Sequence, residues 1–202
     1  MSASGADGRT AVEVRFHGRG GQGVVTAAEL LSVAAFAQGL AAQAIPSFGS
    51  ERTGAPVVAV CRVASRPIRS HDPITTPDAV IVQDPTMLQI PGILDGLRPG
   101  GLLLVNSARR PEDLGLTGTS ARLVTVPASE LSRSRLGRPV PNTVLLGALA
   151  GLTGIVSLSA LQEAIRSRFS GDAGEHNAAL AADGHRVAHE TLAEGDSRAQ
   201  AG

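Results

Sequence analysis

The sequence of 202 residues contains neither tryptophan nor tyrosine, and only four phenylalanines. Few side chains are therefore present on which nucleic-acid bases could stack. The chain also has no lysine, which excludes a Walker A phosphate loop. Its 18 basic residues are balanced by 18 acidic residues. A net charge of zero argues against binding to nucleic acid or to a membrane surface mainly through electrostatic attraction.

A single cysteine, Cys61, excludes a framework of intrachain disulfides and an iron–sulfur cluster held by four cysteines of this chain. It lies in the apolar run 57–63, which predicts a buried structural thiol. No run of 18 uninterrupted apolar residues is present, so we predict no membrane-spanning helix. The first ten residues lack the basic and apolar parts of a secretory signal. We therefore expect a cytoplasmic protein.

The remaining composition is that of an ordinary globular chain, with 43% hydrophobic residues. Its length suits a single domain whose core is built from Leu, Val, Ile and Ala. The two ends are rich in small and polar residues and have little to bury. We therefore predict one domain over residues 11–193, with a disordered N-terminus over 1–10 and a disordered tail over 194–202.

A glycine-rich turn over residues 17–23 is the most informative local feature. It follows an alternating segment, 12–16, that predicts a strand, and it leads into an apolar helix over about 22–38. Strand, glycine turn and helix form the opening unit of a doubly wound α/β domain. The unpaired N–H groups at the start of such a helix are a potential anion site.

The glycines Gly18, Gly20 and Gly23 fit the dinucleotide pattern G-x-G-x-x-G. However, the ribose-binding acid expected about 20 residues later is missing, because residues 40–47 contain no Asp or Glu. We therefore do not expect ordinary NAD binding. The alternative is that the glycines serve only the close packing of the strand against the helix.

Further elements follow from the same kind of pattern. The sequence predicts strands over 41–45, 57–63, 79–82, 102–105 and 122–126, and helices from Asp84 to about Leu97 and over 128–136, 143–152, 158–169 and 175–193. No helix separates the strands 41–45 and 57–63, so these two cannot be joined as a parallel crossover pair. We predict an α/β, Rossmann-like three-layer domain with a mixed, mostly parallel sheet and a helical C-terminal part.

One predicted helix is unusually apolar, and another is rich in small residues. Helix 22–38 has one narrow polar stripe, formed by Gln22, Thr26, Glu29 and Ser32, and is expected to be covered on most sides. Helix 143–152, with Asn142 as its expected N-cap, carries Gly147, Ala148 and Gly151. Such small residues permit close helix contact, either inside this chain or between subunits.

Groups for chemistry are scarce. The five histidines form no metal-binding motif, and His185 and His189 share a helix face without a further ligand. No G-x-S-x-G elbow is present. On the loop 46–56, Glu51 and Arg52 form either a solvated ion pair or a contact to a partner. We identify no catalytic and no metal-binding residue.

Four segments stand together in a characteristic order: GRGGQGV at 18–24, PSFGSERTGAPV at 46–57, PDAVIV at 77–82 and PNTVLLGAL at 141–149. With these segments the chain resembles the gamma subunit of the 2-oxoacid:ferredoxin oxidoreductases, most of all the pyruvate (pyruvate synthase) type. The resemblance covers residues 12–190, almost the whole chain.

The resemblance implies a multi-subunit enzyme for the coenzyme A-dependent oxidative decarboxylation of a 2-oxoacid, in this case of pyruvate to acetyl-CoA. The complex is expected to use thiamine diphosphate, Mg²⁺, iron–sulfur clusters and coenzyme A, with none bound by this chain alone. The implied partners are the alpha, beta and ferredoxin-like delta subunits, with ferredoxin as electron acceptor, and neither nucleic acid nor a membrane.

The resemblance also places a candidate site facing coenzyme A or the other subunits. It consists of Gly18, Arg19, Gly20, Gly21, Gln22, Gly23, Ser47, Glu51, Arg52, Thr53 and Gly54. Arg19 or Arg52 is a candidate partner for a coenzyme A phosphate, since guanidinium suits such bidentate contacts. Two alternatives remain, a non-catalytic scaffold subunit of such a complex and a stand-alone Rossmann-type nucleotide-binding protein.

Overall fold

The computed structural model describes residues 11–46, 54–70, 72–116 and 118–200, with side chains up to Ala193. One sheet contains β1 (Ala11–Arg19), β2 (Ala41–Pro46), β3 (Pro56–Ala64), β4 (Ala79–Val82), β5 (Leu102–Asn106) and β6 (Arg122–Val126). The α-helices of the described residues are α1 (Val24–Ala37), α2 (Ala128–Leu136), α3 (Asn142–Thr153), α4 (Leu158–Arg168) and α5 (Gly171–Gln200). Predictions for residues 1–10 and for Ser47, Glu51, Arg52 and Thr53 lie outside these ranges.

The strands follow the order β2-β3-β1-β4-β5-β6. The neighbouring strands β1, β4, β5 and β6 run parallel to one another, whereas β3 runs antiparallel to both β1 and β2. The predicted mixed, mostly parallel sheet is therefore confirmed. Pairing of β1 with β3 extends from Ala11 opposite Ala64 to Arg19 opposite Pro56, so β1 continues three residues past its predicted end at Phe16.

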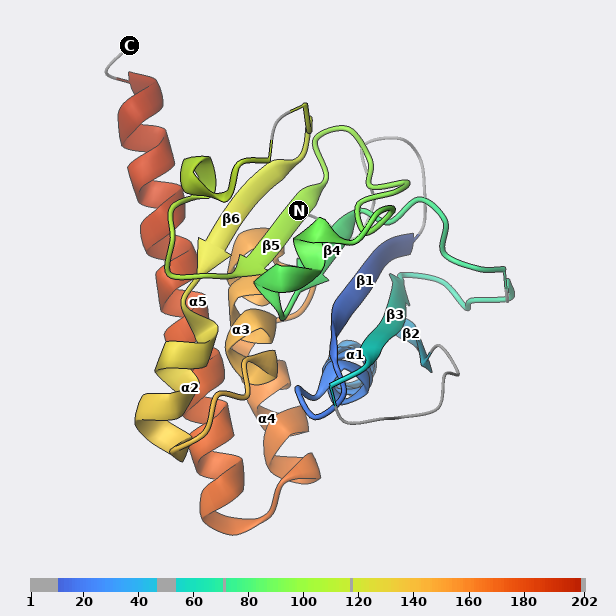
Figure 1. The fold of residues 1–202 in the computed structure, drawn as a ribbon. Helices are drawn as coiled ribbons and strands as arrows, with labels where there is room; N and C mark the ends of the chain where they lie inside the picture. Colours follow the sequence, from blue (N-terminus) through green and yellow to red (C-terminus); the bar gives the residue numbers. More distant parts are fainter. Residues whose placement is uncertain (1–10, 47–53, 71, 117, 201–202) are drawn as a thin grey trace.

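The two faces of the sheet are covered differently (Figure 1). Alternate residues of the strands, such as Ile81 and Leu104, pack with the α-helices in the larger core. The residues between them, such as Val80 and Leu103, pack in a smaller core against Met87 and Ile93. The second cover is thus an irregular chain segment rather than a layer of α-helices.

The predicted helix from Asp84 to Leu97 is wrong in type and length. Asp84 does cap a helix, accepting a hydrogen bond from the Thr86 amide, but the element is a 3₁₀ helix over Pro85–Gln89 that gives way to turns. Pro91 has no amide to donate, and Gly92 adopts φ 81°, a left-handed conformation that ends regular helix. The face of the sheet that carries Val80 and Leu103 is therefore covered by this 3₁₀ and turn segment.

The C-terminal part packs around a close crossing of α3 and α5 (Figure 1). A Cβ atom at Gly147 would collide with the backbone of Ala181, and one at Gly184 with the backbone of Val144. The small residues of α3 therefore serve contact inside the chain. Helix α5 continues to Gln200, beyond its predicted end at 193, so residues 194–200 are helical rather than a disordered tail.

Helix α1 packs its buried residues against the sheet and α4, and Gly39 follows its end with φ 77°. Val33 and Phe36 are exposed, Phe36 by 75%. Among the helices that the structure describes, none combines the length and apolar character that crossing a membrane requires.

Candidate functional site

The candidate site lies where the chain leaves β1 and β4 in opposite directions. These strands are parallel neighbours, but β1 continues through α1 to β2 on one side, and β4 continues to β5 on the other. In open α/β sheets, ligands bind at such a switch point, at the carboxyl ends of the strands. Gly18 and Arg19 end β1 here, and Gln83 and Asp84 follow β4.

Two glycines of the turn are required by close packing. A Cβ atom at Gly18 would lie 2.6 Å from Cγ2 of Val24 and 3.1 Å from Cβ of Gln83. Gly23, with φ 73°, is the N-cap of α1, and a Cβ atom there would overlap the side-chain amide of Asn142. These positions thus let β1, α1 and α3 approach one another.

Arg19 clamps three segments together. Its Nε donates to Oδ2 of Asp84 at 2.9 Å, its Nη1 to the carbonyl of Gly54 at 3.1 Å, and its Nη2 to Oγ1 of Thr86 at 3.0 Å. All three nitrogens of the guanidinium are therefore engaged within the chain. The clamp joins the glycine turn, the loop that ends at Gly54, and the segment after β4.

Asp84 is held as a carboxylate by this clamp. Partial burial raises the pKa of its carboxyl, but hydrogen bonds from Thr86 and the charge of Arg19 outweigh burial and keep the pKa below its usual range. Gln22 reinforces the turn, because its Oε1 accepts the Arg19 amide at 2.8 Å. An ionised Asp84 thus neutralises Arg19 at the switch point.

The glycine turn and the loop are also joined through their backbones. The Gly20 amide donates to the carbonyl of Ala55 at 2.9 Å, and the Gly54 amide donates to the carbonyl of Gly20 at 3.2 Å. The structure therefore brings together the candidates Gly18, Arg19, Gly20, Gln22, Gly23 and Gly54. Gly21 is exposed with no close neighbour for a Cβ atom, and the other four candidates lie outside the described ranges.

A buried polar cluster lies beneath the turn, and sequence reasoning missed its member Gln83. Gln83 is fully buried, and neither its side-chain oxygen nor its nitrogen has a hydrogen-bond partner among the described residues. Asn106 donates to the carbonyl of Gln83 at 2.8 Å and accepts from the Ser129 amide at 3.0 Å. Asn142 is the first residue of α3 rather than its N-cap, and its Nδ2 reaches the Gly23 carbonyl at 3.4 Å. Polar residues directly after buried strands were the signal available for Gln83 and Asn106.

The remaining titratable groups offer little chemistry. Burial raises the pKa of the Cys61 thiol to about 12, which confirms the prediction of a structural thiol. Burial, helped by the charge of Arg15, lowers the pKa of His17 to about 4, so this ring is neutral. The rings of His185 and His189 lie 4.5 Å apart, but no cluster of three or more potential metal ligands occurs in the described part of the chain.

Comparisons with known proteins agree with one another. Residues 13–187 match the family described as pyruvate ferredoxin/flavodoxin oxidoreductase. Pyruvate synthase subunit PorC of Methanosarcina barkeri is 52% identical over 155 residues, which cover 77% of this chain and 85% of that protein. The pyruvate/ketoisovalerate oxidoreductases common subunit gamma of Thermococcus kodakarensis is 46% identical over 172 residues, covering 84% and 93%.

A solved structure supports the same relationship. The crystal structure of pyruvate oxidoreductase subunit PORC from Thermotoga maritima superposes with a TM-score of 0.79 at 35% identity, covering 88% of this chain and 97% of that one. Sequence and fold therefore agree over nearly the full length of these single subunits. The chain belongs to the pyruvate ferredoxin/flavodoxin oxidoreductase family, as a subunit of the gamma type.

Proposed function

We propose that this chain is the gamma subunit of a multi-subunit 2-oxoacid:ferredoxin oxidoreductase that converts pyruvate to acetyl-CoA. The observation that carries the proposal is the match to relatives named as pyruvate synthase or pyruvate/ketoisovalerate oxidoreductase subunits over three quarters or more of the chain. The scarcity of catalytic groups in the described residues accords with a chain that works only in a complex.

The proposed partners are the alpha, beta and delta subunits, with ferredoxin as electron acceptor. Thiamine diphosphate, Mg²⁺ and the iron–sulfur clusters are assigned to those partners. This assignment is supported by Cys61, because iron is ligated by thiolates and a buried thiol with a pKa of about 12 resists ionisation. We therefore assign no cluster to this chain.

For the glycine turn we propose a face toward coenzyme A or a neighbouring subunit. Helix α1 begins without a side-chain cap and without an acidic residue in its first turn, so its N-terminus suits an anion such as a phosphate. The buried amide of Gln83, close to Gly18 at this end of the sheet, offers unused hydrogen-bonding capacity. Both features favour a polar ligand over a purely apolar contact.

The clamp separates the two arginine candidates. Binding a phosphate through Arg19 would require breaking its contacts to Asp84, Thr86 and Gly54. We therefore propose Arg19 as the residue that holds the turn and loop in place, and Arg52 as the candidate partner of a coenzyme A phosphate. In the assembled complex, Arg52→Glu is expected to raise the KM for coenzyme A without preventing assembly. An unchanged KM with intact assembly would remove Arg52 from this role.

The first experiment is co-purification of the tagged chain from its native host, followed by mass spectrometry and a dye-reduction assay with 2-oxoacids. Recovery of thiamine-diphosphate and iron–sulfur subunits, with activity on pyruvate, is the expected result. Activity only with a branched-chain oxoacid would correct the substrate. A chain recovered alone and inactive would contradict the proposal.

The scaffold alternative differs in one measurable respect. If the chain only stabilised its partners, substitutions of Glu51 or Arg52 would change neither turnover nor the dependence on coenzyme A. The stand-alone alternative lacks support, because residues 40–47 carry no acid and, among the described strands, β2 pairs with the antiparallel β3 alone. Failure of the chain to be retained on a nicotinamide-nucleotide column is the expected result.

A further inference from the structure

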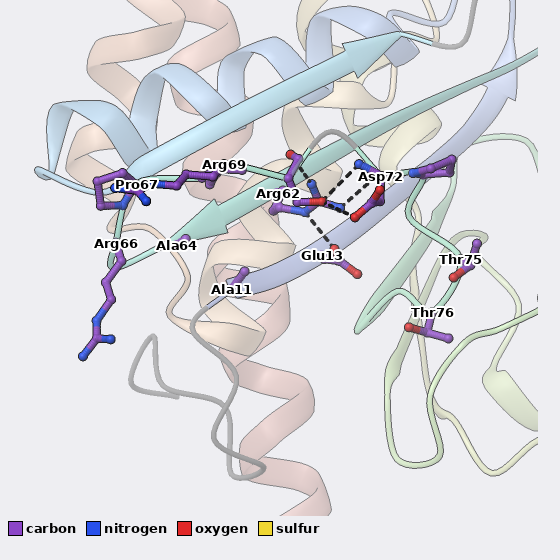
Figure 2. Close-up of a pocket in the computed structure, with 13 residues that line it drawn as sticks. Ala11, Glu13, Arg62, Ala64, Arg66, Pro67, Arg69, Asp72, Thr75 and Thr76 are labelled. Atoms are coloured by element: carbon purple, nitrogen blue, oxygen red, sulfur yellow. Dashed lines mark hydrogen bonds and ion pairs between the residues drawn. The ribbon is translucent and has the colours of Figure 1, made fainter.

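A cavity of about 390 Å³ lies at the end of the sheet opposite the glycine turn. Figure 2 shows it between the start of β1, the end of β3 and the connection that follows β3. Glu13 in this cavity and Arg19 in the turn are six residues apart on one strand, a separation of about 20 Å. The cavity is therefore separate from the proposed coenzyme A face.

Arg62 is the buried cation of this cavity, with a residue exposure of 6%. Its Nε donates to Oε1 of Glu13 at 2.8 Å, its Nη1 to the Ser70 carbonyl at 3.1 Å, and its Nη2 to the Asp72 carbonyl at 3.0 Å (Figure 2). A guanidinium has five N–H donors. Two donors of Arg62 thus have no acceptor among the residues that the structure describes.

Two further arginines line the cavity. Arg66 and Arg69 are exposed, and neither has an ion-pair partner in the described part of the chain. In Figure 2 the Arg66 side chain points away from Arg62 and Glu13, so it stands at the rim of the cavity. The three arginines outnumber the two lining carboxylates, Glu13 and Asp72, which leaves a net charge of +1.

The described residues of the connection after β3, 65–70 and 72–76, shape the cavity. Pro67 and Pro73 restrict its backbone, and the two carbonyls bound by Arg62 attach it to the end of β3. Outside the cavity lining, Arg98 donates to the Thr76 carbonyl at 2.9 Å and holds the far end of the connection. The cavity therefore exists before any ligand binds, which limits the entropy lost on binding.

We propose that this cavity is a second binding site, for a small organic anion that carries a carboxylate or phosphate group. Its volume falls within the range of small-molecule sites. The planar guanidinium of Arg62 has two N–H groups left to donate to one oxyanion, and Arg66 and Arg69 supply the additional positive charge at the rim. The proposal concerns this chain alone and does not depend on the proposed function.

The test is isothermal titration calorimetry of the full chain with three probes. Succinate and inorganic phosphate represent the two kinds of anion, and succinamide is a neutral control of similar size. The expected result is saturable binding of one anion at one site, with no binding of succinamide. Preference for succinate would identify a carboxylate ligand, and preference for phosphate a phosphorylated one.

Variants locate the binding. The double substitution Arg66→Ala/Arg69→Ala is expected to lower the affinity for the anion at least fivefold. It removes two exposed positive charges but leaves the buried ion pair of Arg62 and Glu13 in place. Arg133→Ala, which removes an exposed arginine from α2, is the matched control and should leave the affinity unchanged. Absence of saturable binding by the wild-type chain, or equal weakening by Arg133→Ala, would overturn the proposal.

Arg62 itself is tested by Arg62→Lys, which keeps the charge but loses the planar fork. Loss of anion binding in a variant that still folds would support the proposal, and retained affinity would contradict the role of the fork. If this variant fails to fold, the comparison of the Arg66→Ala/Arg69→Ala and Arg133→Ala variants decides the question.

Discussion

The crossing of α3 and α5 gives the sharpest test of the packing. A Cβ atom at position 147 would lie 2.6 Å from the carbonyl carbon of Ala181, and one at position 184 would lie 2.8 Å from that of Val144. Ordinary van der Waals contact begins at 3.4 Å, so the Cβ atom at position 147 would be 0.8 Å too close to the Ala181 carbonyl carbon. The two carbonyl oxygens are closer still. The obstacles are backbone atoms, which cannot turn aside as a side chain can.

We therefore predict that Gly147→Ala forces the two helices apart and destabilises the chain. Overpacking of this kind costs about 1–3 kcal/mol, and more where rigid backbone must move. The better helix propensity of alanine returns about 1 kcal/mol. We expect a net loss of about 2 kcal/mol, seen as a fall in Tm of about 4–8 °C for a chain of this size. Thermal and urea denaturation of the full chain measure the effect.

The reciprocal glycine provides an internal check. Gly184→Ala should have a similar effect, whereas the double variant should lose less than the sum, because the first Cβ atom already separates the backbones that the second needs separated. Gly151→Ala is a milder comparison, since its Cβ atom would lie 3.0 Å from its nearest neighbours. A Gly147→Ala chain with unchanged or higher Tm would refute the close crossing.

Three further predictions concern individual side chains. His17 is neutral in the folded chain with a pKa of about 4, but it protonates near 6.5 when the chain is unfolded. The free energy of unfolding should therefore fall by as much as about 3 kcal/mol as the pH drops from above 6.5 to 4. In urea titrations, His17→Gln should make this dependence on pH less steep. Asp84→Asn should cost about 1 kcal/mol in urea denaturation, because the partly exposed Arg19 loses its counter-ion; no loss would show that the ion pair contributes nothing to stability. Cys61 should react with a thiol reagent only after denaturation, and rapid labelling of the native chain would contradict its burial.

Local pattern was sufficient for most of the secondary structure. The apolar run 79–82 became β4 with the predicted bounds, and the absence of a helix between β2 and β3 correctly excluded a parallel crossover pair. Both features depend on neighbouring residues only. The helix predicted over 158–169 is α4, and Ser157 caps it by accepting the Ala160 amide.

Tertiary contacts decided what the pattern could not. Met87, Leu94 and Leu97 have helix-like spacing, yet they cover the sheet from 3₁₀, turn and irregular conformations. The pairing of β1 with a nine-residue β3 extended β1 through His17 to Arg19, which no local signal marked as strand. Helix α5 likewise runs beyond the boundary that composition suggested.

The candidate site was predictable in its residues but not in their roles. The sequence singled out Arg19 as a candidate for binding a phosphate, but in the structure its guanidinium is bound to Asp84 and to the Gly54 carbonyl. Asp84 was predicted as the start of a helix, and its contact with Arg19 could not be foreseen because it joins residues 65 positions apart. The place of Gln83 directly after a buried strand was the available signal, but an unpaired buried amide becomes visible only once the surrounding side chains are placed.

The position of β3 between β1 and β2 has a consequence for synthesis on the ribosome. β2 pairs only with β3 in the sheet, and β3 is made after it. While the chain emerges, residues 41–46 therefore have no strand to pair with until residue 64 has left the exit tunnel. An arrest of translation within this interval would leave an uncharged strand, Ala-Ala-Gln-Ala-Ile-Pro, open on both edges, and such unpaired edges favour aggregation.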